Sequence, residues 1–253
     1  MMTTPKRILV LLAMGITVHL AFLGAALAAE IRVLSDGPLE PALVKIGEAF
    51  RRDTGNQVTF VFASSPVIQK RVTSGEMADV LIVQPDFVEE LAKAGKVALG
   101  ERPVISRVGI GLATRADTPG RDISTPETFK QALLNADSLV FNNVASGNYF
   151  AKVLDRLGIA DAIKDKIVRM SPAEVFNRVL HSKGNDIAVG TITLIKATKG
   201  LKLIGALPAE FQSYIIYTAA PMTNAEQPET AKAFIRFLAS PQSKDAFAAA
   251  GAN

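Results

Sequence analysis

The chain alternates short apolar runs with segments in which apolar residues recur every three or four positions. Ile31–Ser35 is the first such run, and the segment from Leu39 to Phe50 follows it with helical spacing until Gly55. Apolar runs of this length predict buried strands, and the periodic segments predict amphipathic helices. Two further strand and helix pairs follow up to Gly95. Successive units of this kind predict a parallel sheet with right-handed crossovers.

Two apolar runs are longer than the others. Val104–Thr114 and Tyr214–Ala220 both exceed the length of the other predicted strands, and strand and helix alternation continues between them. We interpret both as strands that cross between two lobes. The predicted fold class is therefore α/β, with two lobes joined by two hinge strands. The predicted division is residues 29–108 with 216–253 for lobe 1, and residues 109–215 for lobe 2.

Helix-start signals refine this picture at two places. Ser124-Thr125-Pro126-Glu127 has the spacing of a capping box and is predicted to open the first helix of lobe 2 from Ser124. Two segments near the C-terminus, 228–238 and 241–249, each begin with proline close to the first turn. We expect these two helices to pack back on lobe 1.

The first 28 residues have the pattern of a signal peptide. Lys6 and Arg7 precede a largely apolar stretch, and Ala26-Leu27-Ala28 provides small residues at the positions that a signal peptidase requires. We expect cleavage after Ala28 and a periplasmic location. The alternative is an uncleaved membrane anchor, because the apolar stretch approaches the length that spans a bilayer.

Composition excludes several classes of protein. The chain has no cysteine, so disulfides and a lipid-attachment cysteine are excluded. The formal net charge of +4 falls by two when Lys6 and Arg7 are removed, which is too mild to indicate nucleic acid as a partner. Tryptophan is absent as well, so a base-stacking surface is not predicted. We expect a monomer that diffuses freely.

Residues for several kinds of catalysis are missing. His19 belongs to the expected signal peptide, which leaves His181 as the one histidine of the mature chain. With no cysteine, this argues against a zinc site, and a Ser-His-Asp triad would depend on His181 at a predicted helix end. No phosphate-binding loop or dinucleotide fingerprint occurs. We therefore expect neither a metal nor a cofactor.

Three strand-to-helix junctions carry the strongest functional signal. Each is rich in uncharged donors: Ser35–Pro38, Ser64–Pro66 and Ser146–Asn148. The free N–H groups of a first helical turn and nearby hydroxyls attract anions without adding a counter-ion. The alternative is that serine and asparagine are only good N-caps. The junctions predict a receptor for a small anionic solute.

Several segments resemble the molybdate-binding family of periplasmic solute-binding proteins of ABC transporters. They are Ile31–Leu34, Phe62–Ser65, Gly75–Ile82, Ser146–Tyr149 and Ser171–Glu174. The resemblance covers nearly the whole mature chain. It implies a two-lobed fold of the type II periplasmic binding protein kind with a ligand cleft between the lobes. It also implies a small anionic ligand held by hydroxyls and backbone N–H groups, and an ABC permease in the inner membrane as partner.

The resemblance also implies a set of binding residues. Ser65 matches the family's ligand serine, Ser146 the position that presents a backbone N–H, and Phe176 or Val175 another backbone contact. Two positions depart from the family, because Pro38 stands where a ligand serine is usual and Thr191 where a binding tyrosine is usual. The full expected set is Asp36, Gly37, Ser64, Ser65, Ser146, Gly147, Phe176 and Thr191. The two departures favour a longer ligand, such as an organic polycarboxylate, as the alternative to an oxoanion.

A second function stays open on the same scaffold. The segments Val33–Ser35 and Ala145–Tyr149 are also similar to those of a periplasmic aconitate isomerase. Such an enzyme moves a proton next to a carboxylate and needs a base and an acid but no metal. Under this hypothesis Asp36 serves as the base and Tyr149 as the acid. A ligand-sensing partner of a membrane receptor is a third, weaker possibility.

Overall fold

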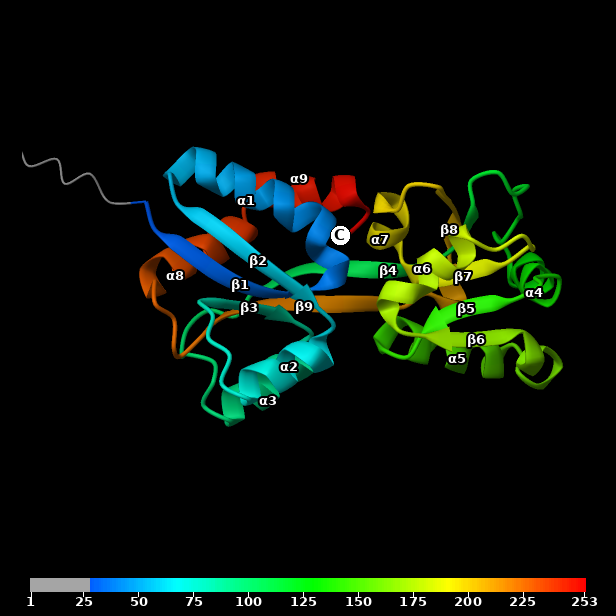
Figure 1. Ribbon diagram of the computed structural model, residues 1–253, viewed down its shortest axis with the longest axis horizontal. Helices are drawn as coiled ribbons and strands as arrows, with labels where there is room; N and C mark the ends of the chain where they lie inside the picture. The colour runs from blue at the N-terminus through cyan, green and yellow to red at the C-terminus, as the bar shows by residue number, and fades with distance from the viewer. Residues whose placement is uncertain (1–27) are drawn as a thin grey trace, which may run out of the picture.

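A computed structural model of the protein describes residues 28–253. The expected signal peptide lies outside the described residues except for Ala28. Within residues 28–253, no helix combines the length and the apolar character needed to cross a bilayer. The elements follow the chain (Figure 1) as β1 Glu30–Asp36, η1 (a 3-10 helix) Gly37–Leu39, α1 Glu40–Thr54, β2 Gln57–Ala63, α2 Ser65–Thr73, β3 Val80–Val83, α3 Pro85–Lys93, β4 Val104–Arg115, α4 Pro126–Leu134, β5 Leu139–Asn142, α5 Ala145–Arg156, η2 Asp161–Lys166, β6 Ile167–Met170, α6 Pro172–Leu180, β7 Ile187–Thr191, α7 Ile192–Ala197, β8 Leu201–Ala206, η3 Ala209–Phe211, β9 Tyr214–Pro221, α8 Pro228–Leu238 and α9 Pro241–Ala250.

The strands pair in the order β2-β1-β3-β9-β4-β7-β5-β6, and β8 pairs with β4. β1 is parallel to β2 and β3, and β5 is parallel to β6 and β7. β9 is antiparallel to β3 and β4, and β4 is antiparallel to β7 and β8. The predicted parallel βα units are therefore present on both sides, and an antiparallel pair joins them.

Buried apolar side chains gather in two parts of the molecule. Two clusters draw their members from residues 31–108 and 215–252, and two others from residues 110–211. The molecule is therefore two-lobed. Lobe 1 contains β1–β3, α1–α3, α8 and α9, and lobe 2 contains β5–β8 and α4–α7.

β4 and β9 connect the lobes (Figure 1). Residues Val104–Gly109 of β4 pair with β9, and the next residues, Ile110–Arg115, pair with β7 and β8. The sheet is thus continuous from one lobe to the other. The boundaries predicted at 108/109 and 215/216 stay a prediction, because two unbroken strands pass through these positions.

Lobe 1 is built around β1. This strand lies between β2 and β3. Its first residues alternate between exposed and buried, and its residues from Val33 onward are buried on both faces. α1 covers one face with Leu43, Ile46 and Phe50. It ends at Gly55, whose φ of 78° lies in the left-handed region that glycine adopts without strain.

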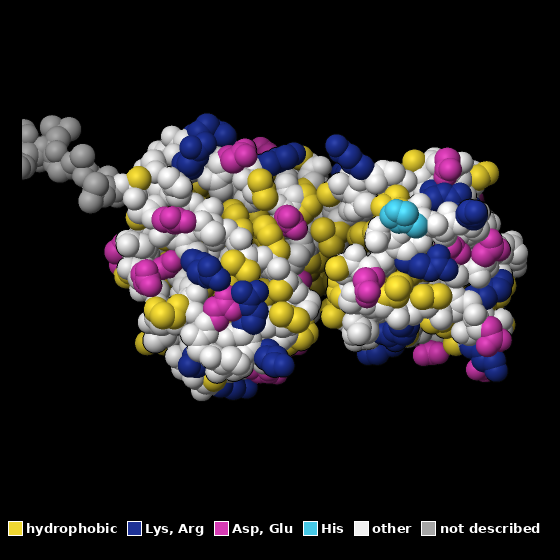
Figure 2. Space-filling view, in the orientation of Figure 1, with side chains coloured by type: hydrophobic (Ala, Val, Ile, Leu, Met, Phe, Trp, Pro, Cys, Tyr) yellow, Lys and Arg dark blue, Asp and Glu magenta, His cyan; other side chains and the backbone are white. Residues whose placement is uncertain are grey.

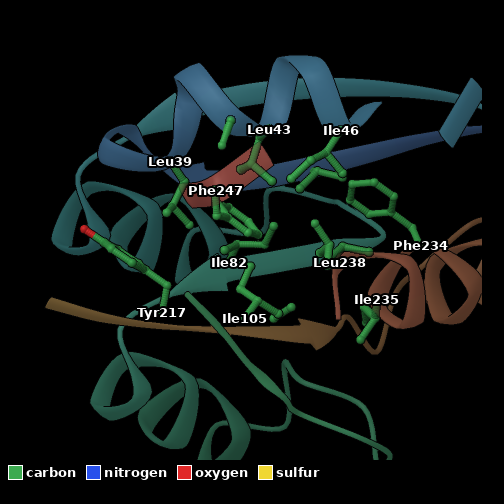
Figure 3. Close-up of a cluster of buried hydrophobic side chains, with 14 of the residues drawn as sticks. Leu39, Leu43, Ile46, Ile82, Ile105, Tyr217, Phe234, Ile235, Leu238 and Phe247 are labelled. Atoms are coloured by element: carbon green, nitrogen blue, oxygen red, sulfur yellow. The ribbon is translucent and has the colours of Figure 1, made fainter. Parts of the chain in front are cut away.

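The C-terminal helices complete the lobe 1 core, as the sequence predicted (Figure 3). Phe234 of α8 meets Phe50 of α1 edge to face, with ring centroids 5.1 Å apart. Phe247 of α9 belongs to the same cluster and is 1% exposed. α8 and α9 therefore pack against α1 in the core of lobe 1.

The start of α4 corrects one prediction. The N-cap is Thr125, whose hydroxyl accepts from the Thr128 N–H and forms a capping box with Thr128. Ser124 is not the cap, because its N–H donates instead to the Asp122 carboxylate at 2.9 Å, which places Ser124 in the preceding turn. Pro126 then occupies the first helical turn, where its missing N–H is not needed.

We predict that Phe234→Ala lowers the free energy of unfolding by about 3–5 kcal/mol, because it removes a fully buried ring and leaves a cavity. Val44→Ala on α1 is the control. Its side chain is 45% exposed, so the expected loss is within about 0.5 kcal/mol. Urea unfolding followed by circular dichroism measures both. Equal losses for the two variants would contradict the packing described here.

Candidate functional site

A cleft of about 370 Å³ lies between the lobes. Its lobe 1 wall consists of the ends of β1 and β2 and the starts of η1 and α2. Its lobe 2 wall consists of the ends of β5 and β7 and the starts of α5 and α6, and β9 adds Ile215 and Tyr217. Figure 2 shows the molecule hollowed between the lobes, with hydrophobic side chains along the hollow. We call this space the cleft.

Helix N-termini from both lobes face the cleft. Ser64 precedes α2 and Val144 precedes α5, and neither side chain caps its helix. The first-turn residues Ser65 and Ser146 line the cleft. Since the first N–H groups of a helix have no partner within it, both ends favour a negative charge or an acceptor.

The protein's own carboxyl group occupies the N-terminus of α2. Asp36 is 6% exposed, and its Oδ2 accepts from the Ser65 hydroxyl at 2.5 Å and from the Gln84 amide at 3.4 Å. Burial raises the pKa of Asp36, although hydrogen bonds from Ser65, Gln84 and the Gly37 backbone act in the opposite direction. Ser65 is thus in the cleft as predicted, but its hydroxyl already donates to Asp36.

Asn142 organises the N-terminus of α5. Its Oδ1 accepts from the N–H groups of Val144 and Gly147, each at 3.1 Å. Its Nδ2 donates to the Ser146 hydroxyl oxygen at 2.9 Å. Because the Ser146 oxygen serves here as acceptor, its hydroxyl hydrogen stays available to donate into the cleft.

Two further hydroxyls line the cleft without a hydrogen-bond partner in residues 28–253. They are the Thr191 Oγ1, on a residue that is 3% exposed, and the hydroxyl of Tyr217, which is fully buried. Figure 3 shows the Tyr217 hydroxyl pointing away from the other labelled side chains of the lobe 1 core. Burial and the nearby Asp36 charge raise the pKa of Tyr217 well above its usual value, so at neutral pH the phenol keeps its proton and is a donor. An unsatisfied buried hydroxyl costs about 1–3 kcal/mol, so a ligand that accepts from both groups is favoured.

Much of the remaining lining is apolar. Phe176 adds its ring, which packs over Gly190 of β7 so closely that a Cβ there would lie 2.7 Å from it. The backbone contact with a ligand that the sequence predicted at Phe176 or Val175 stays a prediction, and both residues line the cleft. Further apolar lining comes from Phe62, Pro66, Val175, Leu194 and Ile215.

The structure brings most of the predicted site together. The members that line the cleft are Asp36, Gly37, Ser64, Ser65, Ser146, Phe176 and Thr191. Gly147 does not line it, because its N–H is turned to Asn142. Tyr149 also lies outside the cleft lining, and its hydroxyl donates to the Phe211 carbonyl at 3.1 Å. An acid that acts on a ligand in the cleft therefore has to be sought among other residues.

The expected set of binding residues lacked five polar residues that line the cleft: Glu40, Gln84, Asn142, Ser171 and Tyr217. Tyr217 lies inside a run interpreted as a crossing strand, and a tyrosine among apolar residues of such a strand was an available signal. Asn142 is the last residue of β5 and Gln84 follows the last residue of β3, and both precede a helix. This is the position at which open α/β sheets bind ligands.

A model of the family described as bacterial extracellular solute-binding proteins matches residues 31–253. The chain belongs to this family. This confirms two expectations from the sequence: that the chain is a solute-binding protein, and that it acts outside the cytoplasm.

Known proteins extend the comparison. An aconitate isomerase of Pseudomonas sp. is 28% identical over 224 residues, covering 86% of this chain and 85% of that protein. The molybdate-binding protein ModA of Escherichia coli strain K12 is 25% identical over 243 residues, covering 92% and 93%. The solved periplasmic molybdate-binding protein of Azotobacter vinelandii superimposes with a TM-score of 0.74 at 17% identity, covering 88% of this chain and 98% of that one. The predicted two-lobed α/β fold of periplasmic binding proteins is confirmed.

We predict that Gly147→Ala destabilises the protein by about 2 kcal/mol or more, because the added Cβ would lie 1.8 Å from the Asn142 carbonyl oxygen and displace the start of α5. Gly37→Ala is the matched control in the other lobe. No atom lies within 4 Å of a Cβ at position 37, so the expected change is within about 0.5 kcal/mol. Urea unfolding separates the two, and a small effect at Gly147 would contradict the close approach.

The raised pKa of Asp36 predicts a pH dependence of stability. Because the folded state binds this proton more tightly than the unfolded state, the contribution of Asp36 falls as the pH rises from about the ordinary value of 3.8 to the folded pKa. The difference in unfolding free energy, Asp36→Asn minus wild type, should therefore increase between pH 4 and pH 8. Urea unfolding at several pH values measures it, and a constant difference would show that Asp36 is not buried as described.

Proposed function

We propose that the protein captures a small anion in the cleft and delivers it to the permease of an ABC transporter. One observation carries the proposal: buried or helix-terminal donors from lobe 2 and from β9 converge on a single cleft and have hydrogen-bonding capacity to spare. These are Ser146, Thr191 and Tyr217. Membership of a solute-binding family and the similarity to molybdate-binding proteins support the same reading.

Closure of the lobes provides the capture step. A ligand that contacts lobe 1 and lobe 2 together stabilises the closed arrangement by the free energy of those contacts. The backbone changes belong to β4 and β9, because these are the strands that pass between the lobes. Closure of this kind requires small backbone changes at a few residues.

The proposed place of action is the periplasm. The chain then passes through the inner membrane, loses residues 1–28 after Ala28, and acts as a monomer that meets its permease by diffusion. The mild net charge supports free diffusion, because a strongly basic surface that would bind nucleic acid is not expected. An intact N-terminus on the native protein, found by mass spectrometry, would contradict the cleavage.

A second candidate function is aconitate isomerisation. The 28% identical relative that carries this activity covers most of the chain, and the cleft contains one buried carboxyl group, Asp36, whose pKa is raised by burial and which is therefore a stronger base than an exposed carboxylate. In this proposal Asp36 removes a proton next to a substrate carboxylate. Interconversion of cis- and trans-aconitate, followed by absorbance, tests it, and loss of turnover in Asp36→Asn is the expected result.

Binding of anions to the cleft is tested by thermal unfolding of the mature protein with molybdate, tungstate, sulfate, phosphate, citrate and both aconitate isomers. We predict a saturable rise of the melting temperature for at least one anion, because a ligand that binds only the folded state stabilises it. The absence of any shift at millimolar concentrations would overturn the proposed function.

Thr191→Val should weaken the binding of that anion about tenfold or more, because it removes a donor to a charged ligand and breaks no internal hydrogen bond. Thr193→Val is the matched control. Thr193 is also buried with an unpartnered hydroxyl within the described residues, but it lies outside the cleft lining. Calorimetric titration compares the two variants, and equal losses would show that the cleft is not the binding site.

A further inference from the structure

Apart from the Tyr217 phenol, the ionisable side chains that line the cleft are carboxyl groups. Among residues 28–253, no lysine, arginine or histidine lines the cleft, whereas Asp36 and Glu40 do. A second negative charge close to Asp36 is disfavoured unless a proton separates the two. A fully ionised anion therefore meets a carboxyl group and no counter-charge.

The lobe 1 side adds a steric and a hydrogen-bonding reason. The Ser65 hydroxyl and backbone, which belong to the start of α2, already bind Asp36. An anion that used this helix end would have to displace a buried carboxyl group. On the lobe 1 side, the group that a ligand meets at α2 is thus Asp36 itself.

The lining of the cleft points to an organic ligand. The walls contributed by Phe62, Phe176, Leu194 and Ile215 suit a carbon skeleton and offer nothing to an oxoanion.

Resting on the proposed function, we propose that the ligand is a small di- or tricarboxylic acid, and that one of its carboxylates pairs with Asp36 by taking up a proton from solvent. The product is a carboxyl–carboxylate pair that shares this proton. The other carboxylates accept from the free donors of the cleft, Ser146, Thr191 and Tyr217. Asp36 is therefore the residue that determines specificity.

The groups that surround Asp36 indicate which residue holds the proton that is taken up with the ligand. α2 presents Ser65, the turn between β3 and α3 presents Gln84, and β9 presents Tyr217. Tyr217 keeps its proton at neutral pH and does not titrate in the range of interest. The other carboxylate of the lining, Glu40 at the start of α1, is exposed to solvent. A proton taken up with the ligand is thus held at Asp36, and Glu40 provides the control.

Calorimetric titration of the mature protein with citrate and with trans-aconitate, in two buffers of different ionisation enthalpy, tests the proposal. We expect net uptake of up to one proton per bound ligand, and an affinity that falls by up to about tenfold per pH unit as the pH rises through the range in which Asp36 of the ligand-free protein is ionised. Molybdate should bind more weakly than both carboxylates. No variant is needed for this measurement.

Asp36→Asn and Glu40→Gln sharpen the test. Asp36→Asn should bind the carboxylate with little pH dependence and without proton uptake, because its amide donates as the protonated carboxyl group does. Glu40→Gln should keep the proton uptake and the pH slope of the wild type.

Three outcomes would overturn the proposal. Carboxylate binding without proton uptake in the wild type would overturn the pairing with Asp36. Selective binding of molybdate or sulfate would overturn the ligand class. Both results leave anion capture itself intact, whereas failure of every tested anion to bind would overturn the proposed function and this inference together.

Discussion

The antiparallel pairing of β4 with β9 is the constraint on which the rest of the structure depends. These two strands join sheets that are otherwise parallel, and each contributes residues to both lobes or to the cleft between them. Parallel βα units place helix N-termini at the carboxyl ends of their strands. Because β4 and β9 bring the two sets of strand ends together, α2 of lobe 1 and α5 of lobe 2 start at the same cleft.

The N-termini of α2 and α5 have different hydrogen-bond partners. At α5 a neutral amide, Asn142, satisfies two N–H groups and leaves the Ser146 hydroxyl free to donate. At α2 a carboxyl group, Asp36, binds the available donors. One side of the cleft is therefore ready for an anion, and the other already holds an ionisable group. Under the proposal above, the α5 side binds a ligand carboxylate through neutral donors, and the α2 side binds another carboxylate together with a proton.

The sequence was sufficient for the strand and helix alternation, for the two crossing strands and for the junctions that line the cleft, because these depend on local periodicity and on turn residues. It was insufficient where the outcome depends on partners distant in the chain. Asp36 and Ser65 are 29 residues apart, and their hydrogen bond changes what Ser65 offers to a ligand. Tyr217 stood out as a tyrosine in an apolar strand, but the absence of a hydrogen-bond partner for its hydroxyl among residues 28–253 depends on the folded structure. The cap of α4 moved by one residue because Asp122 competes for the Ser124 N–H.

The most direct test of the account is a crystal structure of the mature protein grown with trans-aconitate. The account predicts that the ligand lies between the lobes, with one carboxylate within hydrogen-bond distance of Asp36 and others near Ser146 and Tyr217, and that the lobes are closer together than without ligand. A ligand bound to one lobe alone, or outside the cleft, would contradict it.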